Sequence, residues 1–471
     1  HMNMPNLKEA RKRTTKEVQT KNYKANDENK KVLKDKTFFL KTYGCQMNEH
    51  DSENMKGLLK ELGMKEVKDF EDADLIMLNT CSIRENAHNK VFGMLGRIKH
   101  LKQTKKDIVV GITGCMTQEE VVANEIKDKY KWMDFVLGTH NIHKLGDIVA
   151  SSFKERHLTI EAPSIEGDII ESMPVERENK YKAYVNLMYG CDKFFTYCIV
   201  PYTRGKQRSR NKDDIIKEVQ ELKKQGYKEV TLLGQNVNAY GKDLNTNYNM
   251  ANLLEDIAKT NIERVRFMTS HPWDFTDEMI DIIAKYPNIM PSIHLPVQSG
   301  NTDILKLMGR RYTKEEYLTL FNKLKNKIKN VSISTDIIVG FPNETKEQFE
   351  DTIDLVNKCK FDLAYTFIFS KRVGTPAEKM KDEITLEEKE QRLYKLNDLI
   401  NKYALENNKK LENQTVKVLV EAPSDKEGYL MGYTDTNKLV NLKGPETILG
   451  QIVNVKINEA KTWSLNGEYV K

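Results

Sequence analysis

The feature that most constrains the fold is a repeated alternation of short apolar runs with segments of helical periodicity. Between residues 37 and 130, the runs TFFLKTYG, ADLIMLNT and DIVVGITG are each followed by a segment whose apolar residues recur at helical spacing. This alternation is typical of parallel β/α units, in which each helix returns the chain across the sheet. We therefore predict a small doubly wound α/β domain over residues 37–150.

A second alternating series follows, and it predicts a β/α barrel over residues 181–411. Its strands are expected near residues 183–189, 228–233, 264–269, 291–295, 331–339 and 363–369. Six such units suit an incomplete or a complete barrel, and their spacing does not distinguish the two. Short strands separated by turns then predict a small β-barrel over residues 412–471. The fold class is α/β.

Two segments lack such periodicity. Residues 151–180 contain Pro163, Pro174 and many acidic residues, so they are interpreted as a linker. Residues 1–36 are rich in lysine and are expected to form a basic, disordered extension. The segment 8–36 has eleven Lys or Arg against five Asp or Glu, which accounts for the whole net charge of +6. The rest of the chain is neutral overall.

Hydropathy argues against a membrane protein. No stretch approaches the roughly 18 uninterrupted apolar residues that a membrane span requires, and mean hydropathy is −0.62. The first residues show no secretory signal pattern. We therefore expect a cytoplasmic protein, in which six cysteines are more informative as ligands than as disulfides.

Three of the cysteines occupy equivalent places in the first domain. Cys45, Cys81 and Cys115 each lie just beyond the end of a predicted strand. All three should fall on the carboxyl edge of the sheet, where α/β sheets place ligands. Three thiolates there suit an iron-sulfur cluster with one iron lacking a protein ligand, or a zinc ion with an open position. The alternative is that they are buried small hydrophobic residues.

A second constellation follows the first strand of the predicted barrel. Cys191 and Cys198 flank Phe195 in the segment CDKFFTYC. With cysteine at position 195 it would read C-x-x-x-C-x-x-C, the pattern of radical S-adenosylmethionine (SAM) enzymes. Cys359 lies within a segment of helical pattern and is interpreted as a buried structural residue.

Longer motifs along the chain resemble one family. The segments TYGCQMNEHDS, NTCSIRENA, IVPYTRGKQRSR, LLGQNVNAYG, TDIIVGFPNET and FSKRVGTPAEKM are similar to those of radical SAM methylthiotransferases, over about residues 37–471. Within that family, Gln46, Met47 and Asn48 resemble the members that act on isopentenyladenosine in tRNA. The resemblance implies an N-terminal methylthiotransferase domain, a radical SAM barrel resembling part of a TIM barrel, and a C-terminal TRAM domain.

The resemblance also implies two four-iron four-sulfur (4Fe-4S) clusters and SAM. Cys45, Cys81 and Cys115 would hold an auxiliary cluster, and the residues at positions 191, 195 and 198 would hold the cluster that cleaves SAM. The implied reaction adds a methylthio group to carbon 2 of isopentenyladenosine beside the anticodon, with SAM as methyl donor and radical source. Phe195 offers no ligand, so this chain is expected to be an inactive variant.

Other residues are assigned by position. Tyr197 matches the aromatic residue that contacts the SAM adenine, although packing is an equal alternative. Gly234, Gln235 and Asn236 match the segment that meets the methionine end of SAM, with a plain turn as the alternative. Three polar residues at the carboxyl face of the barrel complete the expected cofactor site. These are Gln298, Ser299 and Asp336.

Basic residues after the second constellation predict a contact with nucleic acid. They are Arg204, Lys206, Arg208 and Arg210, which could meet tRNA phosphates unless they are simply solvated surface charge. Expected partners are a tRNA carrying isopentenyladenosine and an electron donor such as flavodoxin or ferredoxin, with the sulfur source open and the chain a monomer. Two alternatives remain: a non-catalytic tRNA-binding or cluster-carrying homologue, and a methylthiotransferase acting on a ribosomal protein.

Overall fold

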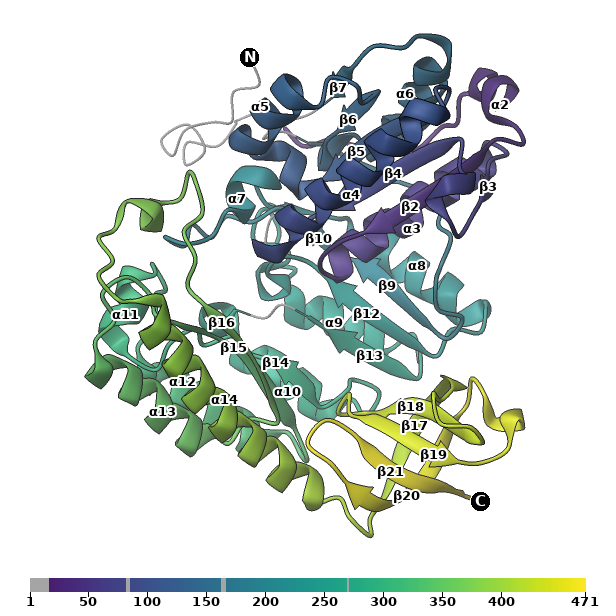
Figure 1. Cartoon of the computed structure of the whole chain (residues 1–471). Coiled ribbons are helices and arrows are strands. Elements are labelled where there is room, and N and C mark those ends of the chain that lie inside the picture. The colour runs from purple at the N-terminus through teal and green to yellow at the C-terminus, as the bar shows by residue number, and fades with distance from the viewer. Residues whose placement is uncertain (1–16, 82–84, 162–166, 269–270) are drawn as a thin grey trace. The chain divides into compact units, whose positions relative to one another are not determined.

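The computed structural model describes residues 17–81, 85–161, 167–268 and 271–471. The chain forms two compact units, whose elements are labelled in Figure 1. The first unit comprises His1–Glu178, Met188–Arg210 and Arg372–Glu378. The second comprises Asn179–Leu187, Asn211–Lys371 and Lys379–Lys471. Among the described residues, no helix is long and apolar enough to cross a membrane.

A six-stranded sheet, parallel throughout, organises the first unit and confirms the doubly wound prediction. Its spatial order is β3-β2-β4-β5-β6-β7. The strands are β2 (Thr37–Thr42), β3 (Lys65–Glu66), β4 (Leu75–Thr80), β5 (Val109–Gly114), β6 (Phe135–Leu137) and β7 (Thr159–Glu161). Because β3 and β4 lie on opposite sides of β2, the order reverses there. In open α/β sheets, such a reversal opens a ligand-binding crevice at the carboxyl ends of the strands.

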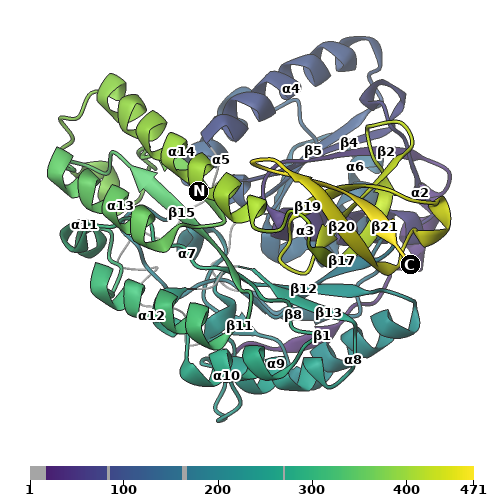
Figure 2. The ribbon, with the colours of Figure 1, turned by 90° about the horizontal axis from the view of Figure 1, so that it is seen from below.

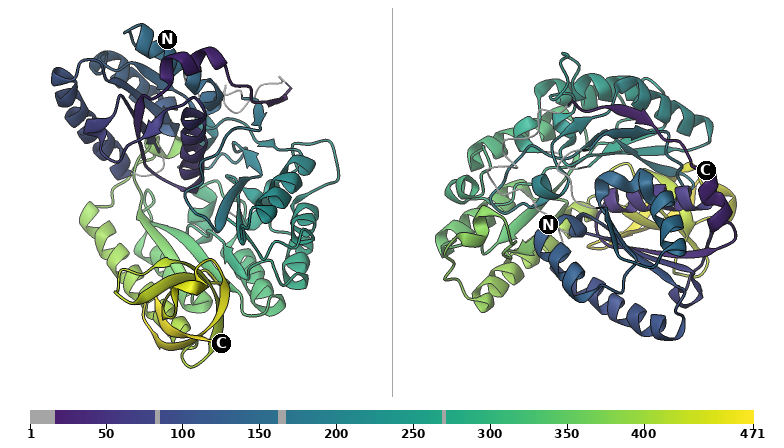
Figure 3. Two further views of the ribbon diagram at one scale, coloured as in Figure 1. Left: turned by 90° about the vertical axis from the view of Figure 1, so that its right-hand side faces the viewer. Right: turned by 90° about the horizontal axis from the view of Figure 1, so that it is seen from above.

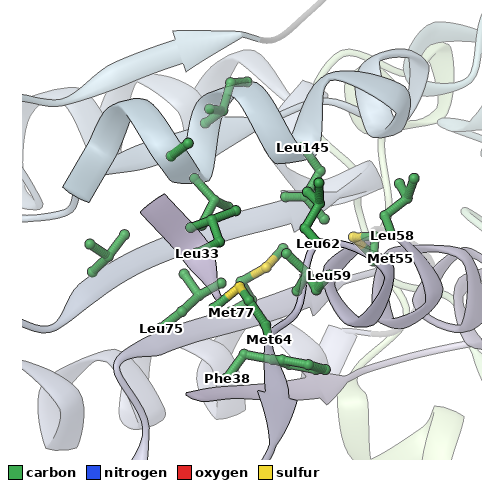
Figure 4. Close-up of a cluster of buried hydrophobic side chains, with 14 of the residues drawn as sticks. Leu33, Phe38, Met55, Leu58, Leu59, Leu62, Met64, Leu75, Met77 and Leu145 are labelled. Atoms are coloured by element: carbon green, nitrogen blue, oxygen red, sulfur yellow. The ribbon is translucent and has the colours of Figure 1, made fainter. Parts of the chain in front are cut away.

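Helices cover both faces of this sheet, so its central strands are buried on both sides. They are α2 (Asp27–Leu33), α3 (Gln46–Glu61), α4 (Glu85–Thr104), α5 (Glu120–Lys129) and α6 (Leu145–Lys154). Along β4, Leu75 and Met77 belong to one apolar cluster, whereas Ile76 and Leu78 belong to another. Figure 4 shows the first cluster, in which Leu59 of α3 lies beside Met77 and Leu145 of α6 lies on the side of Leu62. A continuous apolar run such as LIMLN is the sequence consequence of this double burial.

The N-terminal extension is only partly outside the fold. Residues 1–16 lie outside the described residues, but residues 17–36 contain β1 (Thr20–Asn22) and helix α2. Strand β1 pairs in parallel with β8 (Ile169–Glu171), and Leu33 is completely buried in the core. The expectation of disorder was therefore wrong for residues 17–36. The lysine-rich composition of the segment masked the short amphipathic helix α2, whose apolar side contributes Leu33 to the core.

The expected linker over residues 151–180 is also more ordered than predicted. Helix α6 continues to Lys154, β7 joins the edge of the sheet, and β8 pairs with β1. Further along, Pro174 packs so closely on α3 that a Cβ at Gly57 would lie 2.6 Å from its carbonyl carbon. This segment is bound along the first unit, because backbone pairing compensates for its lack of apolar periodicity.

Six parallel strands form the β/α barrel of the second unit, which confirms the predicted class. They are β9 (Lys182–Asn186), β12 (Glu229–Leu233), β13 (Arg264–Phe267), β14 (Ser292–His294), β15 (Ser332–Val339) and β16 (Leu363–Ile368). The first three make one sheet and the last three another, joined by a single bridge between Val265 and Ile289. No pairing between β9 and β16 occurs in the part of the chain that the structure describes, so the barrel is partial.

Helices surround the outside of this partial barrel, as Figure 2 shows for α8, α9, α10 and α12. They are α8 (Lys212–Lys224), α9 (Met250–Ala258), α10 (Asp277–Lys285), α11 (Thr302–Leu307), α12 (Lys314–Lys327), α13 (Lys346–Cys359) and α14 (Leu386–Lys409). Short 3-10 helices connect several elements in both units. They are η1 (Phe70–Asp72), η2 (Cys115–Gln118), η3 (Thr139–Lys144), η4 (Val237–Ala239), η5 (Pro272–Asp274), η6 (Pro376–Lys379) and η7 (Glu446–Ile448).

The C-terminal strands form the predicted small barrel, closed in the order β17-β18-β19-β21-β20. Figure 3 shows it end-on as a yellow ring in the left panel. The strands are β17 (Thr415–Pro423), β18 (Tyr429–Thr434), β19 (Leu439–Lys443), β20 (Ile452–Ala460) and β21 (Leu465–Val470). Strand β21 was not predicted. It contains Gly467, where a Cβ would lie 2.4 Å from the Lys456 carbonyl oxygen, so close strand packing replaces the usual apolar alternation.

The segment between the first two barrel strands departs from the expected domain boundary. The strand predicted over residues 183–189 is split into β9 and β10 (Met188–Tyr189), and β10 pairs with β11 (Arg208–Ser209). Helix α7 (Val200–Thr203) lies between β10 and β11 and packs against η2. The whole stretch Met188–Arg210 belongs to the first unit, with the three-cysteine edge, rather than to the barrel.

Candidate functional site

The first three cysteines lie where strand ends predicted them, on the carboxyl edge of the first sheet. Cys45 precedes α3 after β2, Cys81 follows β4, and Cys115 begins η2 after β5. The chain turns sharply before Cys45, because Gly44 has a φ of +109° and a Cβ there would lie 2.7 Å from the Cys81 sulfur. Cys45 and Cys81 thus flank the β2/β4 crevice, with Cys115 on the next strand.

Asn48 connects the loops that hold these cysteines. Its Nδ2 donates to the carbonyl oxygens of Tyr43 at 2.8 Å and Thr80 at 2.7 Å. Its backbone carbonyl accepts a hydrogen bond from Asn79 Nδ2 at 2.9 Å. Since Tyr43 and Thr80 precede the loops with Cys45 and Cys81, this one buried amide fixes both loops to the first turn of α3. The sequence identified Asn48 only as part of a family motif.

Arg204 belongs to the same hydrogen-bond network as Asn48, although it was predicted to contact tRNA. Its guanidinium is buried and donates to Asn48 Oδ1 at 2.8 Å, with Asp51 Oδ2 at 3.5 Å. The Cys115 sulfur lies 4.0 Å from the same Asn48 oxygen and interacts electrostatically with the guanidinium. Its partners come from α3 and η2, about 150 and 90 residues earlier in the chain, so no local pattern could have shown this placement.

The other basic residues of this segment do not form a cluster that faces solvent. Arg208 is buried and donates to the Arg204 carbonyl oxygen at 3.1 Å, and Arg210 forms a two-point ion pair with Glu171 at 2.8 Å for each bond. Only Lys206 is partly exposed. The alternative, that these residues are simply solvated surface charge, is wrong for Arg204, Arg208 and Arg210, because their buried side chains hold protein groups. Their contact with tRNA stays a prediction.

The electrostatic environment differs among the three thiols. A hydrogen bond from Cys81 holds the pKa of Cys45 well below its usual range, assisted by Arg204 and by backbone N–H groups at the start of α3. Burial raises the pKa of Cys115 to about 11 despite Arg204. Burial also raises the pKa of Asp51, although Arg204 opposes it. The carboxyl edge of the sheet therefore favours a thiolate at Cys45. A further negative charge there, such as a second thiolate, requires a further positive charge to balance it.

The second constellation holds two sulfurs and an aromatic ring. Cys191 lies after β10, where its N–H donates to the Gly205 carbonyl oxygen at 3.0 Å and its sulfur accepts from the Lys193 N–H at 3.4 Å. The Cys198 N–H donates to the Phe195 carbonyl oxygen at 3.2 Å. Burial raises the pKa of Cys191 to about 12. The loop is formed, but the sequence supplies it with two thiols.

Phe195 has a defined packing partner. Its ring stacks on Tyr197, with centroids 5.8 Å apart and planes inclined by 11°. Both rings are half-buried. Tyr197, predicted to contact the SAM adenine, is therefore engaged by the ring that replaces a cysteine.

The remaining predicted cofactor residues lie in the second unit. Gly234, Gln235 and Asn236 follow β12, and Asn236 Nδ2 donates to Asp274 Oδ2 at 2.7 Å. Gln298 has a φ of +71° and its N–H donates to the Asp336 carbonyl oxygen at 2.9 Å. Its Oε1 is buried without a hydrogen-bond partner. This backbone hydrogen bond holds the segment after β14 against β15. Polar residues of both elements therefore lie near the strand ends, where a cofactor site is expected.

Ser299 and Asp336 have local partners. The Ser299 hydroxyl is completely buried and accepts a hydrogen bond from the Asn301 N–H at 3.1 Å, which is a turn contact. Asp336 lies within β15 rather than after it, and its carboxylate is 3.2 Å from His294 Nε2. His294 was not predicted, because a single histidine on a strand has no sequence signature.

Two exposed aromatic residues on β16 were also missed. Thr366 donates to Asn397 of α14 at 2.6 Å, so Tyr365 and Phe367 project from the opposite face of the strand. Their side chains are 51% and 49% exposed, and the Tyr365 ring meets that of His294 edge-on at 5.9 Å. An aromatic surface next to His294 and Asp336 can stack on a planar ligand.

Comparison with known proteins agrees with this three-part organisation. Residues 37–138 match the family model described as Uncharacterized protein family UPF0004, residues 185–356 match the Radical SAM superfamily, and residues 409–470 match the TRAM domain. A tRNA-2-methylthio-N(6)-dimethylallyladenosine synthase of Staphylococcus epidermidis is 54% identical, over 99% of this chain and 91% of that protein. The chain belongs to this family. A synthase of Staphylococcus aureus is 53% identical over the same shares.

Solved structures support the fold. A radical SAM methyltransferase, TsrM, from Kitasatospora setae, with cobalamin and a [4Fe-4S] cluster bound, has a TM-score of 0.52 at 13% identity, covering 73% of this chain and 77% of that one. The radical SAM enzyme OxsB has a TM-score of 0.51 at 14% identity, covering 79% and 56%. The synthase family is one of enzymes, and its radical SAM domain implies a 4Fe-4S cluster and SAM.

The two cysteine sites differ in how well they fit such a cluster. At the first sheet edge, Cys45 and Cys115 interact electrostatically with the buried Arg204 and Cys81 hydrogen-bonds Cys45, which suits an anionic group with three thiolate ligands. Within the described ranges, no three His, Cys, Asp or Glu side chains are grouped so that they could hold a metal ion as they stand. At the second site, Phe195 presents a ring without a lone pair in place of a third sulfur. The residues of the second site do not fit a three-thiolate cluster.

Proposed function

We propose that this chain has the architecture of a tRNA methylthiotransferase whose radical step is disabled at Phe195. The intended reaction is methylthiolation at carbon 2 of isopentenyladenosine beside the anticodon, with SAM as methyl donor and radical source. The observation that carries the proposal is the Phe195 ring, stacked on Tyr197 between the only two cysteines of its loop. Family membership supports the substrate class, and the Phe195 ring is the reason why we propose that the radical step is disabled.

Cys45, Cys81 and Cys115 would hold an auxiliary 4Fe-4S cluster. When bound, that group supplies an iron site that accepts sulfur for transfer to the substrate. Around it, Asn48 fixes the two loops, and the positive end of α3 favours the Cys45 thiolate. No radical step is assigned to the second loop, because two thiols and a phenyl ring leave its cluster without a third ligand.

The substrate would be a tRNA that already carries isopentenyladenosine. The TRAM match and the names of the relatives support an RNA partner. We further propose an electron donor such as flavodoxin or ferredoxin, a monomeric chain and a cytoplasmic location. The sulfur source is left open.

A second candidate is a non-catalytic tRNA-binding or cluster-carrying homologue, and Phe195 is the observation that favours it. A methylthiotransferase acting on a ribosomal protein is the third, which the Gln46-Met47-Asn48 motif disfavours. Binding assays with isopentenylated tRNA and with ribosomal protein distinguish the substrates. Sequencing the source gene shows whether Phe195 is natural.

Anaerobic reconstitution tests the auxiliary site. The protein should bind one cluster, on the order of four irons per chain. Joint replacement of Cys45, Cys81 and Cys115 by alanine should abolish iron binding and visible absorbance. Cys359→Ala is the matched control, because Cys359 is buried at the end of α13 and should leave the iron content unchanged. Equal iron in the triple variant and the control would overturn the assignment.

A further inference from the structure

Arg204 links the two cysteine constellations of the chain. It lies six residues beyond Cys198 and is delivered by α7 to the edge that holds the other three cysteines. Its guanidinium reaches Asn48 at 2.8 Å and the sulfur of Cys115. Both contacts lie within one compact unit. The segment with the second cysteine pair therefore supplies a positive charge to the first site.

The charge of Arg204 is incompletely neutralised by the protein. Among the side chains that the structure describes, its carboxylate partner is Asp51, at 3.5 Å through a single oxygen, and its shorter contact is to a neutral amide oxygen. Arg210, in the same segment and equally buried, instead receives both oxygens of Glu171 at 2.8 Å. An arginine that only stabilised the fold would be expected to have a partner of the second kind, because unpaired buried charge is costly.

The neighbours of Arg204 show which group would use this charge. Cys115 Sγ and the guanidinium lie 4.0 Å and 2.8 Å from the same Asn48 Oδ1, and Cys45 lies close enough for its thiolate to be stabilised by the guanidinium. Three thiolates outweigh the positive charge of a four-iron four-sulfur core, so an iron-sulfur group held there would be anionic and would become more so on reduction. A fixed cation beside an anionic group favours its more negative, reduced form.

We propose that Arg204 is a positioning and charge-compensating residue of the three-cysteine site, which raises the reduction potential of the iron-sulfur group held by Cys45, Cys81 and Cys115. The inference rests on the proposed function, since it requires a cluster at these cysteines. This role is separate from the tRNA contact that the sequence suggested for this arginine, which stays a prediction.

The test uses the full chain with Cys191 and Cys198 replaced by alanine, so that only the three-cysteine site can hold a cluster. Three variants are compared in that background: Arg204→Met, Arg204→Lys and the matched control Arg210→Met. Each is reconstituted anaerobically, assayed for iron and sulfide, and titrated with dithionite while the reduced cluster is followed by electron paramagnetic resonance.

We expect Arg204→Met to shift the one-electron equilibrium at least tenfold toward the oxidised cluster, which corresponds to about 59 mV. Arg204→Lys should retain most of the parent potential because it keeps the charge, and Arg210→Met should match the parent. Full iron content with equal potentials in all variants would overturn the role of Arg204. Absence of iron from the parent would instead overturn the proposed cluster itself.

Asp51→Asn keeps the test decisive if Arg204→Met does not fold. Removing the one carboxylate near the guanidinium leaves Arg204 with more effective charge toward the cysteines. The potential should then move in the opposite direction, toward the reduced cluster. Because burial raises the pKa of Asp51, the potential is measured at a pH where this carboxyl is ionised. An unchanged potential in Asp51→Asn under that condition would contradict the proposal independently of the arginine variants.

Discussion

Replacing Phe195 by cysteine should allow the chain to bind a second cluster, which the proposed function expects the parent chain to lack. The substitution restores the only position of the second loop that lacks a ligand, and the loop itself is already formed around Cys191 and Cys198. It also removes the ring that stacks on Tyr197. Tyr197 would then be released for the cofactor contact that the family resemblance implies.

The structural cost of this substitution is small. The stacked pair is worth about 0.5–1.5 kcal/mol beyond area burial, and Phe195 is only half-buried, so the cavity term of a core deletion is largely avoided. We expect the free energy of unfolding of the cluster-free protein to fall by about 1–2 kcal/mol. Iron content should rise from about four to about eight per chain.

Phe194→Cys is the matched control. Phe194 is the neighbouring residue, and its ring packs edge-on against Tyr202 at 5.7 Å, in a different small cluster. It introduces the same thiol at the wrong spacing, so it should add no second cluster. With reductant, SAM and isopentenylated tRNA, only Phe195→Cys should produce 5′-deoxyadenosine and the 2-methylthio product.

Two results would refute this reasoning. Turnover by the parent chain would show that another residue completes the radical site. Equal iron gain in Phe194→Cys and Phe195→Cys would show that spacing does not determine ligation. If Phe195→Cys gains both clusters and cleaves SAM but leaves tRNA unmodified, the substrate assignment is wrong and the ligand assignment stands.

Three further predictions concern stability, substrate and thiol reactivity. Leu33→Ala should lower the free energy of unfolding by about 2–5 kcal/mol in urea titrations, whereas exposed Lys31→Ala should change it little; equal effects would remove α2 from the core. Tyr365→Leu should weaken tRNA binding on the order of tenfold, since one base stack is worth about 1–3 kcal/mol, while Tyr394→Leu on exposed α14 should not; matching affinities would exclude the β16 surface. Burial raises the pKa of Cys359 to about 12, so its thiolate is roughly 1,000-fold rarer at pH 8 than at the ordinary pKa of 9, and peptide mapping should find it alkylated only after unfolding.

The sequence predicted those elements whose own residues carry the signal. Strands β2, β4 and β5 and the six barrel strands were found because apolar runs alternate with helical periodicity over many residues. The three-residue strands β6 and β7 were missed, since FVL and TIE are too short to show a period. Their identity depends on neighbours in the sheet, which supply the hydrogen bonds that fix them.

The candidate site was likewise predictable only where the signal lies in the local sequence. Convergence of Cys45, Cys81 and Cys115 followed from strand ends alone, because parallel strands share one carboxyl edge. The roles of Asn48 and Arg204 did not, since their bond joins residues 156 positions apart. A basic run beside a cysteine motif looks the same in sequence whether its guanidinium groups face solvent or sulfur.

The placement of Met188–Arg210 changes how the two cysteine sites should be understood. Separate sequence domains suggested that the three-cysteine site is independent of the second loop. The structure instead places that loop in the first unit, where α7 packs on η2 and Arg204 reaches Cys115. A change in the loop, such as binding of a cluster at positions 191, 195 and 198, would therefore act on the first site through the position of one buried cation. Under the proposed function, Phe195 would then have two consequences: it would remove a ligand from one site, and it would leave the segment that positions Arg204 held by ring packing instead of by a cluster.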